Sequence, residues 1–150
     1  MQKLVMFHID EQQFALSLDH VDRIIPIIET RELPRAPEHV IGTINLSGEL
    51  LPVISMRKLF LIPCRDFELT DQLIIVNTKK IKFALWVDQV AEVLSANESQ
   101  LVPNDKVFIE NELVEGLVQL NNNRILISDP DKFLTNEQIE KLKDMLIAKA

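Results

Sequence analysis

Residues 42–57 read GTINLSGELLPVISMR, a stretch that predicts two short strands joined by a tight turn. Its first residues, up to Leu46, alternate in the manner of a strand with one buried face. Ser47 and Gly48 then turn the chain into a second strand-like run that ends near Ile54. Gly48 suits a turn position with positive φ, which residues with a side chain resist. The stretch therefore predicts a β-hairpin.

Most of the remaining chain also has the pattern of short strands, and three further hairpins are expected. They join residues 4–9 to 14–18, residues 73–76 to 81–87, and residues 117–120 to 124–127. The last pair is connected by Asn121, Asn122 and Asn123, and asparagine tolerates the left-handed backbone of a tight turn. We therefore expect a mainly β protein.

Few helices are expected. Residues 19–24 are predicted to form one or two helical turns with Asp19 as the N-cap, and residues 56–61 another short helix. At the C-terminus, Thr135 and Gln138 have the spacing of a capping box. An amphipathic helix follows, with an apolar stripe of Ile139, Leu142, Met145 and Leu146. We expect this stripe to pack on its own domain, and docking on a partner is the alternative.

The two halves of the chain look like a divergent internal duplication. Gly42 opens a strand, a turn and a second strand that ends near residues 52–54. Gly116 opens the same series, which ends near residues 126–127. Two small barrels of short strands would explain this order of elements.

Composition and charge restrict the function. The 150 residues suit one domain or two small, closely packed ones. A net charge of −7 argues against nucleic acid and against an anionic membrane surface, and it favours a monomer when the protein is isolated. The single cysteine, Cys64, cannot form an internal disulfide, so we expect a cytoplasmic protein. No apolar run approaches the roughly 18 residues of a membrane helix, so no membrane insertion is expected.

No pattern of catalytic or metal-binding residues stands out. His8, His20 and His39 lack the spacing of a metal site, and none of them lies beside Cys64. No serine lies in a G-x-S-x-G turn, and three glycines are too few for a phosphate-binding loop. We expect no enzyme, no metal and no cofactor. An enzyme with carboxylates that converge from distant strands is the open alternative.

Several segments, taken in order, resemble the CheW-like domain of bacterial chemotaxis coupling proteins. Residues 42–48 and 52–57 are similar to the family segments G-x-x-N-L-R-G and P-V-I-D-L-R, and residues 87–90 to V-D-x-V. The other similar segments are the opening hairpin with its Val-x-Glu-Ile turn at residues 7–24, the proline loop at residues 33–42, and the last strands from residue 113 onward. The resemblance covers nearly the whole chain.

This resemblance implies a mainly β fold of two packed five-stranded SH3-like barrels with short helices. Residues 1–150 would form a single CheW-like domain of two intertwined β-barrel subdomains. It also implies a non-catalytic adaptor that couples the cytoplasmic tips of chemoreceptors to a CheA-type histidine kinase. The expected partners are the regulatory domain of the kinase, which shares the fold, and the helical hairpin tip of the receptor. Such a tip fits the apolar seam between two barrels.

The resemblance also implies a partner-binding site, for which the candidates are Val21, Arg23, Ile24, Asn45, Ser47 and Gly48. Arg23 stands where the family has Glu, Ser47 where it has Arg, and Ser55 where it has Asp. If positions 23 and 47 face each other, as the family implies, the family's ion pair is absent. The alternative function is therefore a divergent CheW-like regulatory module that acts on a different signalling partner outside the receptor array.

Overall fold

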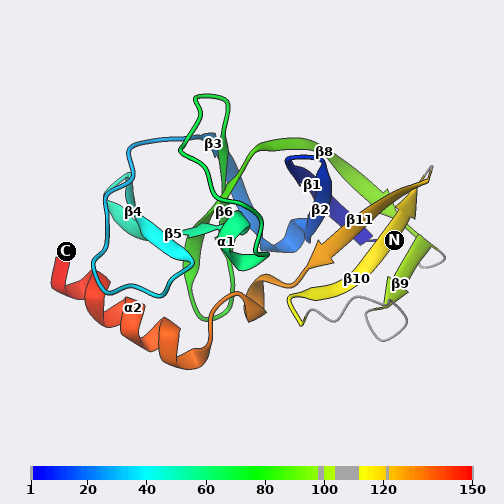
Figure 1. Cartoon of the computed structure of the whole chain (residues 1–150). Coiled ribbons are helices and arrows are strands. Elements are labelled where there is room, and N and C mark those ends of the chain that lie inside the picture. Colours follow the sequence, from blue (N-terminus) through cyan, green and yellow to red (C-terminus); the bar gives the residue numbers. More distant parts are fainter. Residues whose placement is uncertain (1, 98–99, 104–111, 121, 150) are drawn as a thin grey trace.

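The computed structural model, drawn in Figure 1, describes residues 2–97, 100–103, 112–120 and 122–149. Within these residues two β-sheets make up the two halves of the molecule. The chain begins in one sheet, builds the other, and then returns to the first. Helix α2 (Asn136–Lys149) closes the described chain and runs along the outside of the second sheet (Figure 1).

Barrel one is the sheet that contains the start of the chain. Its strands are, in spatial order, β8 (Gln89–Ala96), β1 (Gln2–Ile9), β2 (Gln12–Ser17), β11 (Asn123–Ser128), β10 (Val114–Leu120) and β9 (Leu101–Pro103). The two outer strands, β8 and β9, follow each other in the chain, so the sheet curls until its edges approach. The sheet has six strands, and it corresponds to the predicted five-stranded barrel when β8 and β9 are counted together as one strand.

Barrel two is the other sheet, and its strands are contiguous in sequence. They are, in spatial order, β3 (Val21–Pro26), β6 (Gln72–Asn77), β7 (Lys82–Val87), β5 (Glu49–Ser55) and β4 (Val40–Leu46). The segment after β3 closes this barrel. The Ile27 amide donates to the Asp71 carbonyl at 3.1 Å, and Arg31 exchanges two backbone hydrogen bonds with Thr43, at 2.9 and 2.7 Å.

The buried apolar side chains form three clusters: one inside each barrel and one between the barrels. On β6, Leu73 and Ile75 point into barrel two, whereas Ile74 and Val76 point outward. This alternation follows from the two-residue period of a strand. The shared cluster between the barrels contains Phe7, Ile9, Phe14 and Leu16 of barrel one and Ile54, Ile74, Val76, Phe83, Leu85 and Val87 of barrel two. The apolar seam expected between the barrels is therefore present, and it is filled by packing.

The internal duplication is visible as the same irregularity in both barrels. The pairing of β4 with β5 shifts between Val40 and Gly42, and that of β10 with β11 shifts between Val114 and Gly116. In each barrel the second strand of this hairpin also lies parallel to a strand from another hairpin, β5 beside β7 and β11 beside β2. The two glycines that suggested the duplication thus occupy equivalent bulges.

The prediction of a helix at residues 19–24 is wrong. A single 3-10 turn spans Leu18–His20, with Ser17 rather than Asp19 as its N-cap, and β3 begins at Val21. The β-branched residues of this segment suit a strand, and pairing with β6 satisfies the backbone. Tertiary pairing decides the structure here.

The other helices agree more closely with prediction. Helix α1 (Met56–Leu59) is shorter than the predicted 56–61, with Ser55 as its N-cap. The capping box of α2 is confirmed: the Thr135 amide donates to the Gln138 side chain at 2.9 Å, and the Gln138 amide to the Thr135 hydroxyl at 3.1 Å. Ile139 and Leu142 are buried in the shared cluster. The helix therefore packs on its own chain, as expected.

Candidate partner-binding surface

The predicted site residues lie on two segments of barrel two. Val21, Arg23 and Ile24 belong to β3, where Arg23 is exposed and Ile24 is 38% exposed. The other three lie at the β4–β5 hairpin. Asn45 is an exposed residue near the end of β4, and Ser47 and Gly48 form the turn. We call these six residues the predicted surface.

The β4–β5 turn has the geometry of a two-residue hairpin. Leu46 pairs with Glu49, so only Ser47 and Gly48 lie between the strands, with φ angles of 53° and 89°. Positive φ at both positions is the requirement of a type I′ turn. The side-chain oxygen of Asn45 accepts a hydrogen bond from the Gly48 amide at 2.8 Å. This bond holds the turn in place, and the positive φ predicted for Gly48 is confirmed.

Lys82 of β7 brings the two segments together. Its ammonium lies 3.2 Å from Asp22 of β3 and 3.3 Å from Glu49 of the hairpin. Hydrogen bonds to these two carboxylates raise the pKa of Lys82. Among the described residues Arg23 has no ion pair, so the pair that the family places at positions 23 and 47 is absent. A different ion bridge connects β3 to the hairpin, with Asp22 one residue from position 23 and Glu49 two residues from position 47.

The strand β3 also borders the seam between the barrels. Ile24 pairs across the sheet with Ile74, which belongs to the shared cluster, and Val21 packs against that cluster. On the barrel-one side Val90 of β8 packs against it too, and its amide donates to the Gln72 side chain at 2.7 Å. The accessible part of the seam is therefore its margin.

A groove of about 600 Å³ runs between the β4–β5 turn and the end of α2. Asn45, Gly48 and Leu50 line one side, and Leu146 and Ile147 line the other. Ile147 is 74% exposed, so it presents an apolar side chain at the edge of this groove. Arg31 and Glu49 also line this groove, so its surface is partly charged and partly apolar. The predicted surface thus continues into a groove that the sequence pattern did not indicate.

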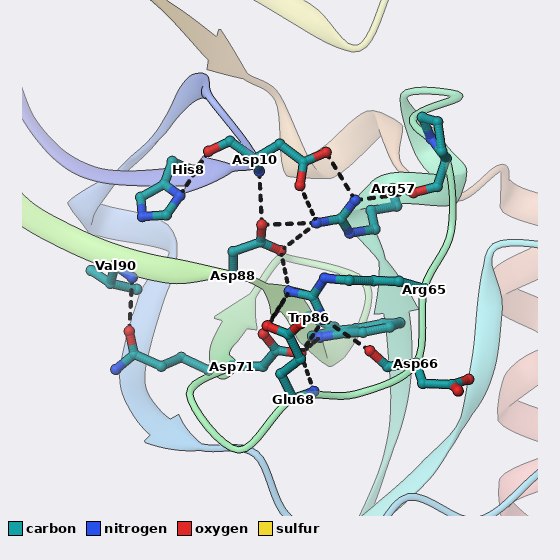
Figure 2. Close-up of polar contacts among 12 residues, drawn as sticks. His8, Asp10, Arg57, Arg65, Asp66, Glu68, Asp71, Trp86, Asp88 and Val90 are labelled. Carbon is teal, nitrogen blue, oxygen red and sulfur yellow. Dashed lines mark hydrogen bonds and ion pairs between the residues drawn. The ribbon is translucent and has the colours of Figure 1, made fainter.

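A charged cluster at the junction of the barrels was not found by sequence reasoning (Figure 2). We call Asp10, Arg57, Arg65, Asp71 and Asp88 the junction network. Arg57 of α1 is 4% exposed and donates to Asp10, in the β1–β2 turn of barrel one, at 2.8 and 3.1 Å. It also donates to Asp88, between the barrels, at 2.8 and 3.0 Å. The hydrogen bond to Asp10 is the largest factor that raises the pKa of Arg57.

The other half of the junction network holds the loop that precedes β6. Arg65 forms a two-pronged pair with Asp71, both distances 2.8 Å, and a third bond of 3.0 Å with Asp88. The buried Asp71 also accepts from the Trp86 indole at 2.9 Å and from the Glu68 amide at 2.8 Å. Burial by itself would raise the pKa of Asp71, but these hydrogen bonds outweigh it and keep that pKa below the usual value.

This network was missed because its members are far apart in sequence. Arg57 and Asp88 lie in segments that resemble family motifs, yet no local spacing connects them to Asp10 or Arg65. Ion pairs of this kind arise from tertiary structure, and pattern reading does not detect them. In the described part of the chain no group of three His, Cys, Asp or Glu side chains has the arrangement to hold a metal ion. Nor does any helix there have the length and apolarity to cross a membrane.

Comparison with known proteins places this geometry in context. The model of the CheW-like domain matches residues 3–138. Chemotaxis protein CheW of Treponema pallidum is 24% identical over 149 residues, which is 95% of this chain and 88% of the relative. Chemotaxis protein CheW of Thermotoga maritima is 29% identical over 132 residues, with 88% and 87% of the two chains covered. The crystal structure of the scaffolding protein TtCheW from Thermoanaerobacter tengcongensis is similar, with a TM-score of 0.81, 30% identity, and coverage of 90% and 89%.

Proposed function

The chain belongs to the CheW-like domain family, and on this premise we propose that it is a chemotaxis scaffold. It acts as a non-catalytic adaptor that couples the cytoplasmic tips of chemoreceptors to a CheA-type histidine kinase. The observation that carries the proposal is the match along residues 3–138, together with the similarity of the fold to a scaffolding protein over 90% of the chain. An adaptor needs surfaces rather than reacting groups, and exposed apolar residues border the seam and the hairpin groove.

The proposed partner site is the predicted surface, extended along the seam margin. Ile24 and Val90 present apolar side chains on either side of the seam, which suits the apolar face of a helical tip. Asn45, Ser47 and Gly48 form a stiff turn beside the groove, which suits the surface of a related barrel. The interface would be modest in area, as in many signalling contacts.

We also propose that residues 1–150 act as one domain of two intertwined barrels, located in the cytoplasm and monomeric when isolated. The shared cluster supports the single domain, because separating the barrels would expose Phe7, Phe14 and Phe83 to water. The acidic net charge of −7 supports the monomer.

A second candidate function is a regulatory module that binds a different signalling partner. It is favoured by Arg23, which is exposed, carries the opposite charge to the family residue, and has no ion pair among the described residues. Reversal of a charge on a docking surface changes partner choice, because like charges across an interface are strongly unfavourable.

Co-sedimentation with receptor-containing membranes and the kinase of the same host tests both functions. We expect the wild-type protein to sediment with both, and the double variant Arg23→Glu with Ser47→Arg to change the amount bound. The variant Arg124→Glu is the control, because it reverses an exposed charge on barrel one. If neither wild type nor double variant binds receptor or kinase, the scaffold function is wrong, and a different bound partner would support the second candidate.

A further inference from the structure

Asp10 lies in an exposed turn of barrel one. Its backbone φ is 51°, a left-handed conformation that aspartate adopts more readily than most residues with a side chain. Its carboxylate crosses from barrel one to barrel two and receives two hydrogen bonds from Arg57 (Figure 2).

The bond between Asp10 and Arg57 supplies something that the shared apolar cluster does not. Apolar contacts are non-directional, so they fix the relative position of two packed sheets less sharply than a hydrogen bond of defined geometry does. Packed layers can slide by small shear movements. The planar guanidinium of Arg57, by contrast, donates two parallel hydrogen bonds to the Asp10 carboxylate, and this two-pronged pairing has a restricted geometry.

We propose that Asp10 is a positioning residue, a latch that fixes the relative position of the two barrels and therefore the shape of the seam margin. It is the one barrel-one carboxylate in the junction network. Arg57 retains Asp88 as a partner when Asp10 is removed, so no buried charge is left unpaired. The Asp10 amide also donates to Asp88 at 2.7 Å, and this backbone bond survives substitution of the side chain. Variants at Asp10 are therefore expected to fold.

The latch matters for partner binding because the seam margin has one side on each barrel. Val90 lies two residues beyond Asp88 on the barrel-one side, and Ile27, just after β3 on the barrel-two side, bonds to the Asp71 carbonyl. Both sides of the margin are thus attached to the junction network. A partner that contacts Ile24 and Val90 together would bind the latched position best. This consequence for binding rests on the proposed function, whereas the latch itself does not.

Distance measurement between spin labels on the two barrels tests the latch. Labels are attached at Asn77→Cys in barrel two and Gln119→Cys in barrel one, both exposed, in a Cys64→Ser background. We expect one narrow distance distribution for this protein. With Asp10→Asn, which removes the charge, or with Asp10→Gly, which removes the whole side chain, the distribution should broaden or shift. The control Glu11→Gln removes a neighbouring charge in the same turn and should change nothing.

Unchanged distributions in both Asp10 variants would overturn the latch, and so would equal broadening by the Glu11 control. Binding to receptor fragments supplies the second measurement. If the competent position is populated only in part, apparent affinity falls by that fraction. We expect about threefold weaker binding for Asp10→Asn, measured at a temperature well below the melting temperature of both proteins so that both are folded. If the wild type binds no receptor, the proposed function fails, and the distance measurement still decides the latch.

Discussion

At the scale of single residues, Gly42 has the tightest surroundings of any glycine whose neighbours are known. A Cβ atom built on it would lie 2.3 Å from the Arg31 carbonyl oxygen and 2.9 Å from the Thr30 methyl group. Real Cβ atoms do not approach backbone this closely, so the segment that closes barrel two would have to move. Gly48, in contrast, has open space around it and needs glycine only for its positive φ.

Gly42→Ala should therefore destabilise the protein more than Gly48→Ala. We expect a loss of about 2 kcal/mol in the free energy of unfolding for Gly42→Ala, because the clash displaces backbone. The matched Gly48→Ala change should cost about 1 kcal/mol, the typical penalty of a left-handed residue with a side chain. Urea unfolding of both variants measures the difference, and equal losses would contradict the steric explanation.

Arg65 supplies the positive charge that pairs with the buried carboxylate of Asp71. The Asp71 side chain is 1% exposed, so removal of its two-pronged partner leaves a buried charge with fewer bonds. Arg65→Ala should lower the free energy of unfolding by about 2–3 kcal/mol. Arg31→Ala removes an arginine that is 81% exposed and pairs loosely with Glu29, and it should have almost no effect. Thermal and urea unfolding test this contrast, which similar losses in the two variants would refute.

At the scale of elements, the end of α1 carries a leucine where glycine is usual. The Ile62 amide donates to the Arg57 carbonyl at 2.8 Å and the Leu61 amide to the Lys58 carbonyl at 3.4 Å, the bond pattern of a Schellman motif. Leu61 occupies the left-handed position with φ of 55° and is 91% exposed. Its side chain therefore adds strain without burying apolar surface.

Leu61→Gly should stabilise the protein by about 0.5–1 kcal/mol, the relief of left-handed strain less the extra entropy of glycine in the unfolded chain. Leu69→Gly is the matched control, since Leu69 is 96% exposed but its φ is not positive. The control should be neutral or slightly destabilising. Denaturant midpoints distinguish the two, and a loss of stability in Leu61→Gly would contradict the assignment.

The elements also differ in how far the sequence predicts them. The hairpins were predictable because their signals are local: alternation along each strand and turn residues such as Gly48 and Asn122, which has a φ of 69°. The strand β3 was not, because only its pairing with β6 distinguishes it from a short helix. Strand β9 was not among the predicted strands, and residues 104–111 lie outside the described chain.

The candidate site, too, was predictable from the sequence only where its signals are local. Resemblance to a family indicated the two segments of the predicted surface, and the structure joins them through Lys82, whose role depends on contacts with Asp22 and Glu49. The groove beside α2 and the junction network bring together residues that are distant in the chain. Neither leaves a periodic or spaced pattern in the sequence.

At the scale of the whole molecule, the shared cluster predicts that both barrels unfold together. Trp86 lies inside barrel two, so its fluorescence reports on that barrel, whereas amide exchange of β10 and β11 reports on barrel one. We expect coincident transitions in urea, because the unfolding of either barrel would expose the other barrel's side of the shared cluster. Two separated transitions would show that the barrels are independent domains.

His39 should make the stability of the molecule sensitive to mild acid. Burial lowers the pKa of His39, although a hydrogen bond with the Phe133 backbone and the charge of Glu38 oppose this shift. Its Nε2 atom is buried and has no hydrogen-bond partner among the described residues. As the pH falls below about 6.5, the unfolded chain binds a proton that the folded protein resists, so stability decreases.

The size of this effect is measurable by unfolding between pH 8 and pH 5 with His39→Asn as the comparison. The wild-type free energy of unfolding should fall more steeply below pH 6.5, by up to about 1.4 kcal/mol per pH unit for one proton. Contributions from other groups, such as Glu115, whose pKa is raised by burial, cancel in the comparison. Parallel curves for the two proteins would exclude His39 as the source.

The placement of β2 beside β11 has a consequence for synthesis on the ribosome. One continuous segment, residues 21–87, contains all strands of barrel two, whereas barrel one needs strands from both ends of the chain. The hairpin of β1 and β2 therefore emerges from the ribosome first, before the strands β8 and β11 that pair with it. During that delay, Phe7 and Phe14 have the newly closed second barrel as the first surface that can cover them. A nascent chain whose first 88 residues have left the ribosome should thus contain a complete second barrel packed against an incomplete first one.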